Sequence, residues 1–255
     1  MPHVDFTAVT EHPGDPATED QIARLYDRYR FAATQARGGR VLEVACGSGI
    51  GLPYLARHAS ALVGGDIDAE HVQSAARHGL PIVRLDAGHL PFRDDAFDLI
   101  FIGEAVYYLP DVERVLGEVA RVLRAGGRIA VTTVNPRWPG WVGSSHSVRY
   151  HDHAELSRLL SAAGFSVTAY GAFPDRGTGR LTAQARKILV RLKLVPGSLK
   201  ARALLKRVVY GRLSPLPSEI VDLEGSSATW TRLQEDEAGE RFSILHIVGV
   251  VRKPD

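Results

Sequence analysis

The sequence contains a single cysteine, Cys46, among its 255 residues, so a disulfide bond within the chain is excluded. It also lacks any run of about 18 apolar residues, the length that a membrane-spanning helix needs. The first twenty residues have no apolar core, so we expect no signal peptide there. These absences favour a cytoplasmic protein, in which Cys46 fills a tight turn rather than acting as a nucleophile.

Acidic residues are absent from residues 176–212, which hold eleven Lys and Arg. The whole chain has a net charge of only +2, so the remainder is acidic overall. Such an asymmetry is typical of contact with an anionic partner. Nucleic acid is not expected, because the basic residues are confined to this segment and no nucleic-acid-binding motif accompanies them.

Apolar runs and helical patterns alternate along most of the chain after residues 1–18, which are polar and expected to be mobile. We expect strands at 40–44, 61–65, 82–85, 97–102, 128–134, 165–170 and 242–251. We expect helices at 19–35, 52–58, 69–78, 111–124 and 152–163. Short apolar strands separated by helices predict an α/β fold, in which a mostly parallel sheet is covered on both faces.

The domain organisation is expected to be a single domain, 1–255, with one insertion. The predicted cofactor-binding core is 19–174 and the final strand lies in 241–252. Between them, residues 175–240 are too long for a loop. We expect a helical cap or lid there, with basic helices near 181–193 and 198–212 and an acidic stretch at 219–240.

The basic cap permits three interpretations that the sequence does not separate. It can pack on the core with a solvated basic face, or grip an anionic acceptor such as a phosphorylated sugar, lipid or carboxylate. It can also lie on an anionic membrane surface and deliver a lipid-like acceptor. The acidic stretch could instead neutralise the basic helices within the protein.

The segment VLEVACGSGIGLPYLA, residues 41–56, is the most informative part of the chain. It reads as a short apolar strand, a loop with glycine at every second position, and a helix. Glycine allows a backbone to pass close under a ligand, so Gly47, Gly49 and Gly51 are expected to give that clearance. With Glu43 near the end of the strand, this arrangement favours a nucleoside-bearing small molecule above the loop.

Three acidic residues lie in or directly after successive predicted strands: Glu43, Asp66 and Asp86. In a parallel sheet the carboxyl ends of neighbouring strands border one crevice, so these side chains are expected to converge on one ligand. A carboxylate at Asp66 could accept both hydroxyls of a ribose, and one at Asp86 could accept an amine such as that of adenine. Alternatively, either aspartate could cap the turn that follows it.

Four segments in order, VLEVACGSGIG, GGDIDAEHV, LDAGHLPFRDDAFDLIF and LGEVARVLRAGGRIAVTT, resemble the class I S-adenosylmethionine-dependent methyltransferases. The resemblance is closest to the type 11 small-molecule branch and covers roughly residues 20–172. It implies a Rossmann-like, seven-stranded sheet and S-adenosyl-L-methionine as cofactor. A nicotinamide dinucleotide site is a weaker alternative, because its fingerprint would need glycine at Leu52.

The resemblance also implies a set of cofactor-binding residues. The methionine part would be bordered by Glu43, Ala45, Cys46, Gly47 and Gly49, and Tyr26 would close over the carboxylate of the cofactor. Asp66 would bind the ribose, and Gly103 would pass beside the cofactor. Ile67 would pack on the adenine, and Asp86 with Ala87 would hold the adenine amine. Ala45 departs from the family pattern, which has its first loop glycine there.

The general base is expected in one of two clusters. His146 is the preferred candidate, because it lies in the loop after the predicted strand 128–134, where the acceptor should sit. The second cluster is Glu104, Tyr107 and Tyr108. Ubiquinone-type O-methyltransferases resemble this segment but have a metal-binding Glu-x-x-Glu-His there, and only Glu104 is kept, so we expect no metal. Packing of the two tyrosines against the sheet is the alternative.

The predicted function is methylation of a small-molecule acceptor, and O-methylation of a natural-product, sugar or lipid-linked metabolite is the first choice. N- and C-methylation stay open, because cofactor motifs do not report the acceptor atom. Two further alternatives are a cofactor-binding partner subunit without catalysis and a methyltransferase-fold enzyme that catalyses a non-transfer reaction such as cyclisation. The sequence does not indicate an oligomeric state.

Overall fold

The computed structural model of the chain describes residues 10–141, 143–144, 146–174, 213–220, 228–234, 237 and 239–252. The two helices predicted in the basic segment lie outside these residues.

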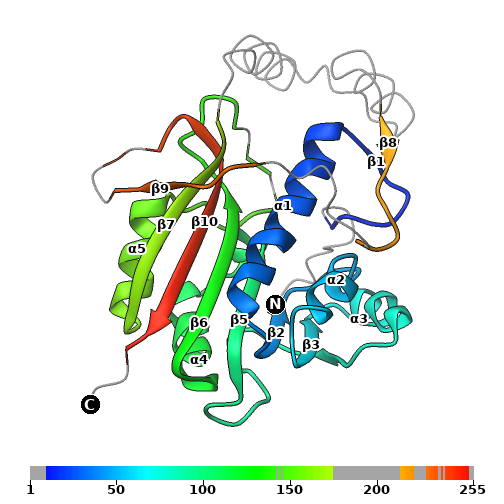
Figure 1. Cartoon of the computed structure of the whole chain (residues 1–255), viewed down its shortest axis with the longest axis vertical. Coiled ribbons are helices and arrows are strands. Elements are labelled where there is room, and N and C mark those ends of the chain that lie inside the picture. The colour runs from blue at the N-terminus through cyan, green and yellow to red at the C-terminus, as the bar shows by residue number, and fades with distance from the viewer. Residues whose placement is uncertain are drawn as a thin grey trace.

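The described residues form an eight-stranded sheet in the order β4-β3-β2-β5-β6-β10-β7-β9 (Figure 1). The strands are β2 (Arg40–Val44), β3 (Ala61–Asp66), β4 (Ile82–Arg84), β5 (Phe97–Gly103), β6 (Leu123–Val134), β7 (Phe165–Pro174), β9 (Thr231–Leu233) and β10 (Phe242–Val251). Neighbours from β4 to β6 are parallel, whereas β10 runs antiparallel to both β6 and β7. The predicted Rossmann-like, mostly parallel fold is confirmed. The additional strand is β9, a three-residue edge strand within the predicted cap 175–240.

Helices cover both faces of the sheet (Figure 1). They are α1 (Glu19–Ala36), α2 (Leu52–Ala56), α3 (Ala69–Ala75), α4 (Val112–Val122) and α5 (His153–Ala162), with short 3₁₀ turns η1 (Ala76–His78) and η2 (Val106–Tyr108). Residues of α4 and α5 belong to one apolar cluster, and residues of α1, α2 and α3 to the other. No helix in the described part is both long and apolar enough to span a membrane.

Strand β5 shows why the sequence has such continuous apolar runs. Ile100 and Ile102 lie in the cluster of α4 and α5, whereas Leu99 and Phe101 lie in the cluster of α1. Successive side chains of a strand point to opposite faces, so a strand covered on both sides has apolar residues on both, as Leu99 to Ile102 do.

Several helices are shorter than predicted, and the end of α4 shows a physical reason. The expected helix 111–124 ends at Val122, and Leu123 is extended and pairs with Phe97 of β5. Leu123 is fully buried, so packing of its side chain and the β5 ladder outweigh continuation of the helix. Gly126 lies where the register between β5 and β6 is irregular, between Leu123 and Arg128, and its φ of +70° favours glycine.

The described part of the N-terminal segment is held against the core rather than mobile as expected. Strand β1 (Pro16–Ala17) pairs antiparallel with β8 (Ser214–Pro215), which follows the basic segment. Residues 213–220, which we call the strap, also contact the glycine loop. The amide of Ile220 donates to the carbonyl of Ile50 at 2.9 Å. Local composition could not reveal this, because the partners are about two hundred residues apart in the sequence.

Candidate active site

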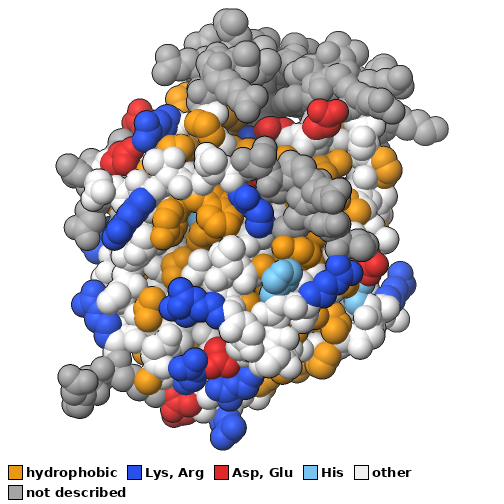
Figure 2. All heavy atoms as spheres, in the orientation of Figure 1, with side chains coloured by type: hydrophobic (Ala, Val, Ile, Leu, Met, Phe, Trp, Pro, Cys, Tyr) orange, Lys and Arg blue, Asp and Glu red, His pale blue; other side chains and the backbone are white. Residues whose placement is uncertain are grey.

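A cleft of about 1360 Å³ lies at the carboxyl ends of the parallel strands, between the loop after β2 and the start of β10. Its walls come from residues 10 and 11, α1, the loops after β2, β3, β4 and β5, η2, and the ends of β6 and β10. Parallel α/β sheets bind their ligands at this edge. On the visible face of Figure 2, Lys and Arg side chains are spread among acidic, apolar and neutral atoms.

The glycine loop after β2 is held tightly, but its glycines serve different neighbours. Gly47 lines the cleft with a φ of +56°, and a Cβ there would lie 2.9 Å from Thr10. A Cβ on Gly49 would lie 2.9 Å from Ala75 of α3, and one on Gly51 would collide with the Tyr29 ring. The expectation that all three glycines make room for a ligand is therefore wrong: Gly49 and Gly51 make room for protein side chains.

Ala45 adopts a left-handed conformation, with a φ of +59°, which favours glycine. A Cβ in this region costs about 1 kcal/mol. The tight turn therefore forms without the glycine, at the expense of local strain.

Glu43 of β2 is buried at the floor of the cleft. Its Oε1 accepts a hydrogen bond of 2.7 Å from the Tyr29 hydroxyl, whereas its Oε2 has no partner among the described residues. Burial raises the pKa of Glu43 to about 8, and the Tyr29 hydrogen bond and Arg28 oppose this shift only in part. An unpartnered buried carboxyl oxygen fits a ligand that brings a cation or an N–H group.

Asp66, at the end of β3, is engaged with the protein on both oxygens. Oδ2 accepts from the Gly47 amide and Oδ1 from the Asp68 amide, both at 2.9 Å. Nδ1 of His71, a cleft residue that sequence reasoning missed, lies 3.3 Å from Oδ1, and this hydrogen bond raises the pKa of His71. Asp66 thus has less free capacity for two ribose hydroxyls than the sequence suggested.

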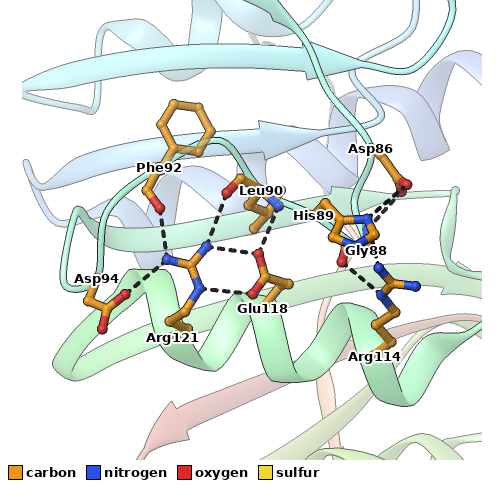
Figure 3. Close-up of polar contacts among 9 residues, drawn as sticks. All are labelled: Asp86, Gly88, His89, Leu90, Phe92, Asp94, Arg114, Glu118 and Arg121. Atoms are coloured by element: carbon orange, nitrogen blue, oxygen red, sulfur yellow. Dashed lines mark hydrogen bonds and ion pairs between the residues drawn. The ribbon is translucent and has the colours of Figure 1, made fainter.

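Ile67 and Asp86 line the cleft after β3 and β4, the two strands at one edge of the sheet. The Ile67 side chain is 51% exposed, which is unusual for a large apolar residue in this protein and fits packing against a flat ring. Asp86 accepts from the Gly88 amide at 2.8 Å, and the same loop is held by Arg114 of α4, which donates to the Gly88 carbonyl at 3.1 Å (Figure 3).

Helix α4 fastens the remainder of this loop through an ion pair (Figure 3). Glu118 accepts from the Leu90 amide at 2.8 Å, and Arg121 donates to the carbonyls of Leu90 and Phe92. The partners of Glu118, above all Arg121, lower its pKa to about 2. The segments LDAGHLPFRDDAFDLIF and LGEVARVLRAGGRIAVTT, which both carry the resemblance, thus contact each other through these bonds.

Helix α1 contributes residues other than the predicted one. Leu25, Arg28 and Tyr29 line the cleft, whereas Tyr26 lies outside it, partly buried against the apolar cluster of α1. Positions three and four apart share a helix face, and Tyr26 is about 100° of rotation from Leu25. Arg28 is buried, and its ion pair with Glu11 raises the pKa of the guanidinium although burial alone would lower it.

Glu104 follows β5 in a left-handed conformation, with a φ of +54°. The Tyr107 hydroxyl donates to its Oε2 at 3.1 Å, and its Oε1 is buried without a partner among the described residues. Burial raises the pKa of Glu104 to about 7. Tyr108 also lines the cleft, and burial raises the pKa of its hydroxyl to about 12, so it is protonated at neutral pH.

His146 is not brought into this cluster. It is exposed, its amide donates to Ser144 Oγ at 3.2 Å, and it is not a cleft residue. The loop instead turns Val148 into the cleft, because the amide of Val148 donates to the Tyr107 carbonyl at 2.9 Å.

Most predicted cofactor residues thus share one cleft, and Tyr26 and Gly49 lie outside its lining. Those inside it are Glu43, Ala45, Cys46, Gly47, Asp66, Ile67, Asp86, Ala87 and Gly103. Within the described part of the chain, no group of three or more His, Cys, Asp or Glu side chains could hold a metal ion. Metal independence stays a prediction.

Comparison with known proteins places this cleft in a family context. Residues 42–131 match the family model described as "Methyltransferase domain", type 11. Over 143 residues the chain is 37% identical to the phthiotriol/phenolphthiotriol dimycocerosates methyltransferase 1 of Mycobacterium ulcerans, covering 53% of this chain and 50% of that protein. Over 140 residues it is 36% identical to the fatty-acid O-methyltransferase of Mycolicibacterium smegmatis, covering 50% of this chain and 51% of that protein.

The chain therefore spans about half the length of the curated relatives that it matches. The fold extends further: a crystal structure of an S-adenosylmethionine-dependent methyltransferase from Thermotoga maritima, a possible histamine N-methyltransferase, superposes with a TM-score of 0.56 at 17% identity. That match covers 91% of this chain and 95% of the other. Residues 42–131 of this chain are therefore similar to the type 11 methyltransferase family, which the sequence motifs also indicate.

Proposed function

We propose that this protein is a methyltransferase that uses S-adenosyl-L-methionine to methylate a small apolar acceptor, with O-methylation as the reaction. The observation that carries the proposal is that Glu43, Asp66 and Asp86 lie in one cleft beside the strained glycine loop. The relatives named above act on lipids, which fits the apolar part of this cleft. A cytoplasmic location belongs to the same proposal.

The residues of the cleft fit the parts of the cofactor one by one. The free Oε2 of Glu43 suits the charged amino-acid end, where Arg28 would bind the carboxylate. Asp66 suits a ribose hydroxyl, and exposed Ile67 with Asp86 suits the adenine. When bound, the cofactor supplies an electrophilic methyl group carried on a sulfonium.

Glu104 is the best-placed base for an acceptor hydroxyl. A carboxyl group with a pKa of about 7 is close to the pH at which a general base is most effective. Tyr107 donates to one carboxyl oxygen and leaves the other for the acceptor. Tyr108 can orient the acceptor by hydrogen bonding. We assign the proton-accepting role to Glu104 rather than to His146, which is exposed outside the cleft.

Calorimetric titration with S-adenosylmethionine and S-adenosylhomocysteine tests the cofactor assignment directly. We expect both to bind, and Asp66→Asn to weaken binding at least tenfold. The matched control is Asp94→Asn, an exposed carboxylate outside the cleft, which should bind as the intact protein does. No binding by the intact protein would refute the proposal. Binding without transfer to any acceptor would favour a non-catalytic partner subunit.

A further inference from the structure

Arg24 of α1 is a cleft residue that the proposed chemistry does not use. It lies one helical turn before Arg28, so the two side chains share the face of α1 that lines the cleft. The Cζ atom of its guanidinium lies 5.6 Å from the ring centre of Trp138 and 5.8 Å from that of Phe173. These cation–π contacts hold the charged end of Arg24 at the loop after β6 and the end of β7.

Strand order places Arg24 away from the proposed adenine end of the cleft. Asp86 follows β4 at one edge of the sheet, and Glu104 follows β5 near its middle. Trp138 and Phe173, which hold Arg24, belong to the loop after β6 and to β7, on the other side of β5. The cleft therefore extends from the cofactor residues past the proposed base to Arg24, and this far end is where an acceptor has room.

The charge of Arg24 reaches the proposed base. Burial raises the pKa of Glu104, and the charge of Arg24 is among those that oppose this rise. A guanidinium that acts on a carboxyl group of the same cleft has its charged end near that cleft, and not only its aliphatic stem. The lining also includes the apolar side chains of Val134, Val148 and Ile244. The cleft thus combines a base, a cation and apolar surface.

The two arginines of this helix face differ in how well the protein neutralises them. Arg28 is buried and pairs with Glu11. Arg24 donates to Asp20 at 2.8 Å, but the Asp20 side chain is 67% exposed, so water screens the pair and it contributes little. Nε of Arg24 is buried without a partner among the described residues. Since a guanidinium has five N–H donors, Arg24 keeps donor capacity for a ligand.

The ligand group that best fits Arg24 is a carboxylate, because a guanidinium binds one through two parallel N–H···O bonds. A doubly charged phosphate monoester would need a second cation, and Arg28 is already paired with Glu11. We propose that Arg24 is a specificity-determining residue that binds a carboxylate of the acceptor, and that the acceptor is an apolar hydroxy acid with its hydroxyl group at Glu104. The carboxylate is held by Arg24 and takes no part in the proton transfer. This inference rests on the proposed function and names its substrate class.

The binding test compares β-hydroxydecanoate with β-hydroxydecanamide on protein saturated with S-adenosylhomocysteine, by calorimetry. The two compounds share chain and hydroxyl group, and only the acid is charged. We expect the acid to bind about tenfold more tightly than the amide. Arg24→Gln should weaken acid binding about tenfold and leave amide binding unchanged. Arg24→Lys keeps the charge but not the planar fork, so it should retain part of the preference for the acid.

Two further variants serve as controls. Asp20→Asn removes the carboxylate that shares the guanidinium, so acid binding should tighten about two- to threefold while amide binding stays the same. Arg158→Gln removes an exposed arginine of α5 outside the cleft, and both compounds should bind as they do to the intact protein. If Arg24 served only to pack on Trp138, Arg24→Gln would weaken acid and amide equally, and the proposal would be overturned.

The outcomes separate this inference from the proposed function. If S-adenosylhomocysteine does not bind, the proposed function fails, and the comparison of acid with amide on the ligand-free protein still tests Arg24. If it binds but the amide binds as tightly as the acid, or neither compound binds, the carboxylate specificity is refuted.

The product of methyl transfer gives an independent test. We expect β-hydroxydecanoate to become a methyl ether, which resists alkaline hydrolysis. A methyl ester, which alkali cleaves, would show that the carboxylate lies at the transferred methyl group rather than at Arg24, and would overturn the proposal.

Discussion

Asp27 of α1 and Glu43 of β2 are both buried carboxyl groups, but their pKa values are shifted in opposite directions. Asp27 is surrounded by donors from His246, Arg30 and Trp230, and its pKa is lowered. Glu43 has one donor and one unpartnered oxygen, and its pKa is raised to about 8.

The difference shows how to separate a carboxyl group that supports the fold from one that serves a ligand. Desolvation penalises both charges, and only the number of donors decides whether the charge is retained. The group that the protein satisfies completely is structural. The group that it leaves half satisfied beside a cleft has capacity for a ligand.

Removing Asp27 should have the largest effect on the fold. Asp27→Ala leaves the buried His246 without its partner and removes an acceptor from the partly exposed Arg30 and Trp230, and we expect it to lower the free energy of unfolding by about 3–5 kcal/mol. Urea denaturation measures this change. The control is Asp20→Ala, an exposed residue of the same helix, which should change stability by less than about 0.5 kcal/mol. Equal effects of the two substitutions would contradict the distinction between the carboxyl groups.

Removing the charge of Glu104 should affect the rate rather than the fold. We expect Glu104→Gln to slow methyl transfer to a long-chain alcohol about a hundredfold, because the acceptor loses its base. The rate of the intact protein should rise as the pH passes about 7, and this rise should be absent in the variant. Glu113→Gln, on the exposed side of α4, serves as control. A variant that retains both rate and pH profile would exclude Glu104 as the base.

Glu43 should make stability fall as the pH rises. In the unfolded chain its carboxyl group is ionised above its ordinary pKa of 4.5, whereas in the fold it keeps its proton until about pH 8. The unfolded state therefore binds fewer protons in this range, and the free energy of unfolding declines with pH. Glu43→Gln should remove this part of the decline.

Glu104 contributes with the same sign up to about pH 7, so the pH series is best measured in a Glu104→Gln background. Urea midpoints between about pH 5 and 8 follow the effect. The same Glu43→Gln substitution should weaken S-adenosylmethionine binding about tenfold, since glutamine cannot ionise beside the ammonium group of the cofactor as Glu43 can. A pH series identical with and without Glu43 would show that its folded pKa is ordinary.

Ala45→Gly should have the smallest effect, and in the opposite direction. It relieves the left-handed strain but increases the freedom of the unfolded chain, so we expect a net stabilisation of about 0.5 kcal/mol. Thermal or urea unfolding measures it. In Ala61→Gly, within β3, only the entropic cost applies, and stability should decrease. A loss of stability in both variants would mean that Ala45 is not strained.

The parts of this molecule that could be predicted from the sequence are those set by local patterns. Strand order along the chain, the glycine loop and the carboxylates at or near the carboxyl ends of β2, β3 and β4 follow from periodicity and motif spacing. The glycine loop and these carboxylates come together in one cleft. The register of β10 beside β6 does not follow from any local pattern. For that reason the contact of Asp27 with His246, 219 residues apart, could not be foreseen.

The errors at the site have the same origin. Tyr26 and Tyr29 are indistinguishable by composition, and only the rotation of α1 against the sheet places Tyr29 over Glu43. The sequence favours His146 because its loop leaves the correct edge of the sheet. The direction of that loop is set by the hydrogen bond from Val148 to Tyr107, which the sequence does not encode as a motif.

The pairing of β1 with β8 limits how short a fragment of this protein can be if it is to keep the whole cleft. Thr10 and Glu11 belong to the cleft wall. They precede β1, which pairs with β8 in the strap, residues 213–220. A fragment limited to residues 42–131 would carry the family motifs but would lack Arg28, Glu11 and the strap. A fragment that keeps the complete cleft must therefore be longer than the segment that matches the family model. It must include residues 10 and 11 and the strap beyond residue 212.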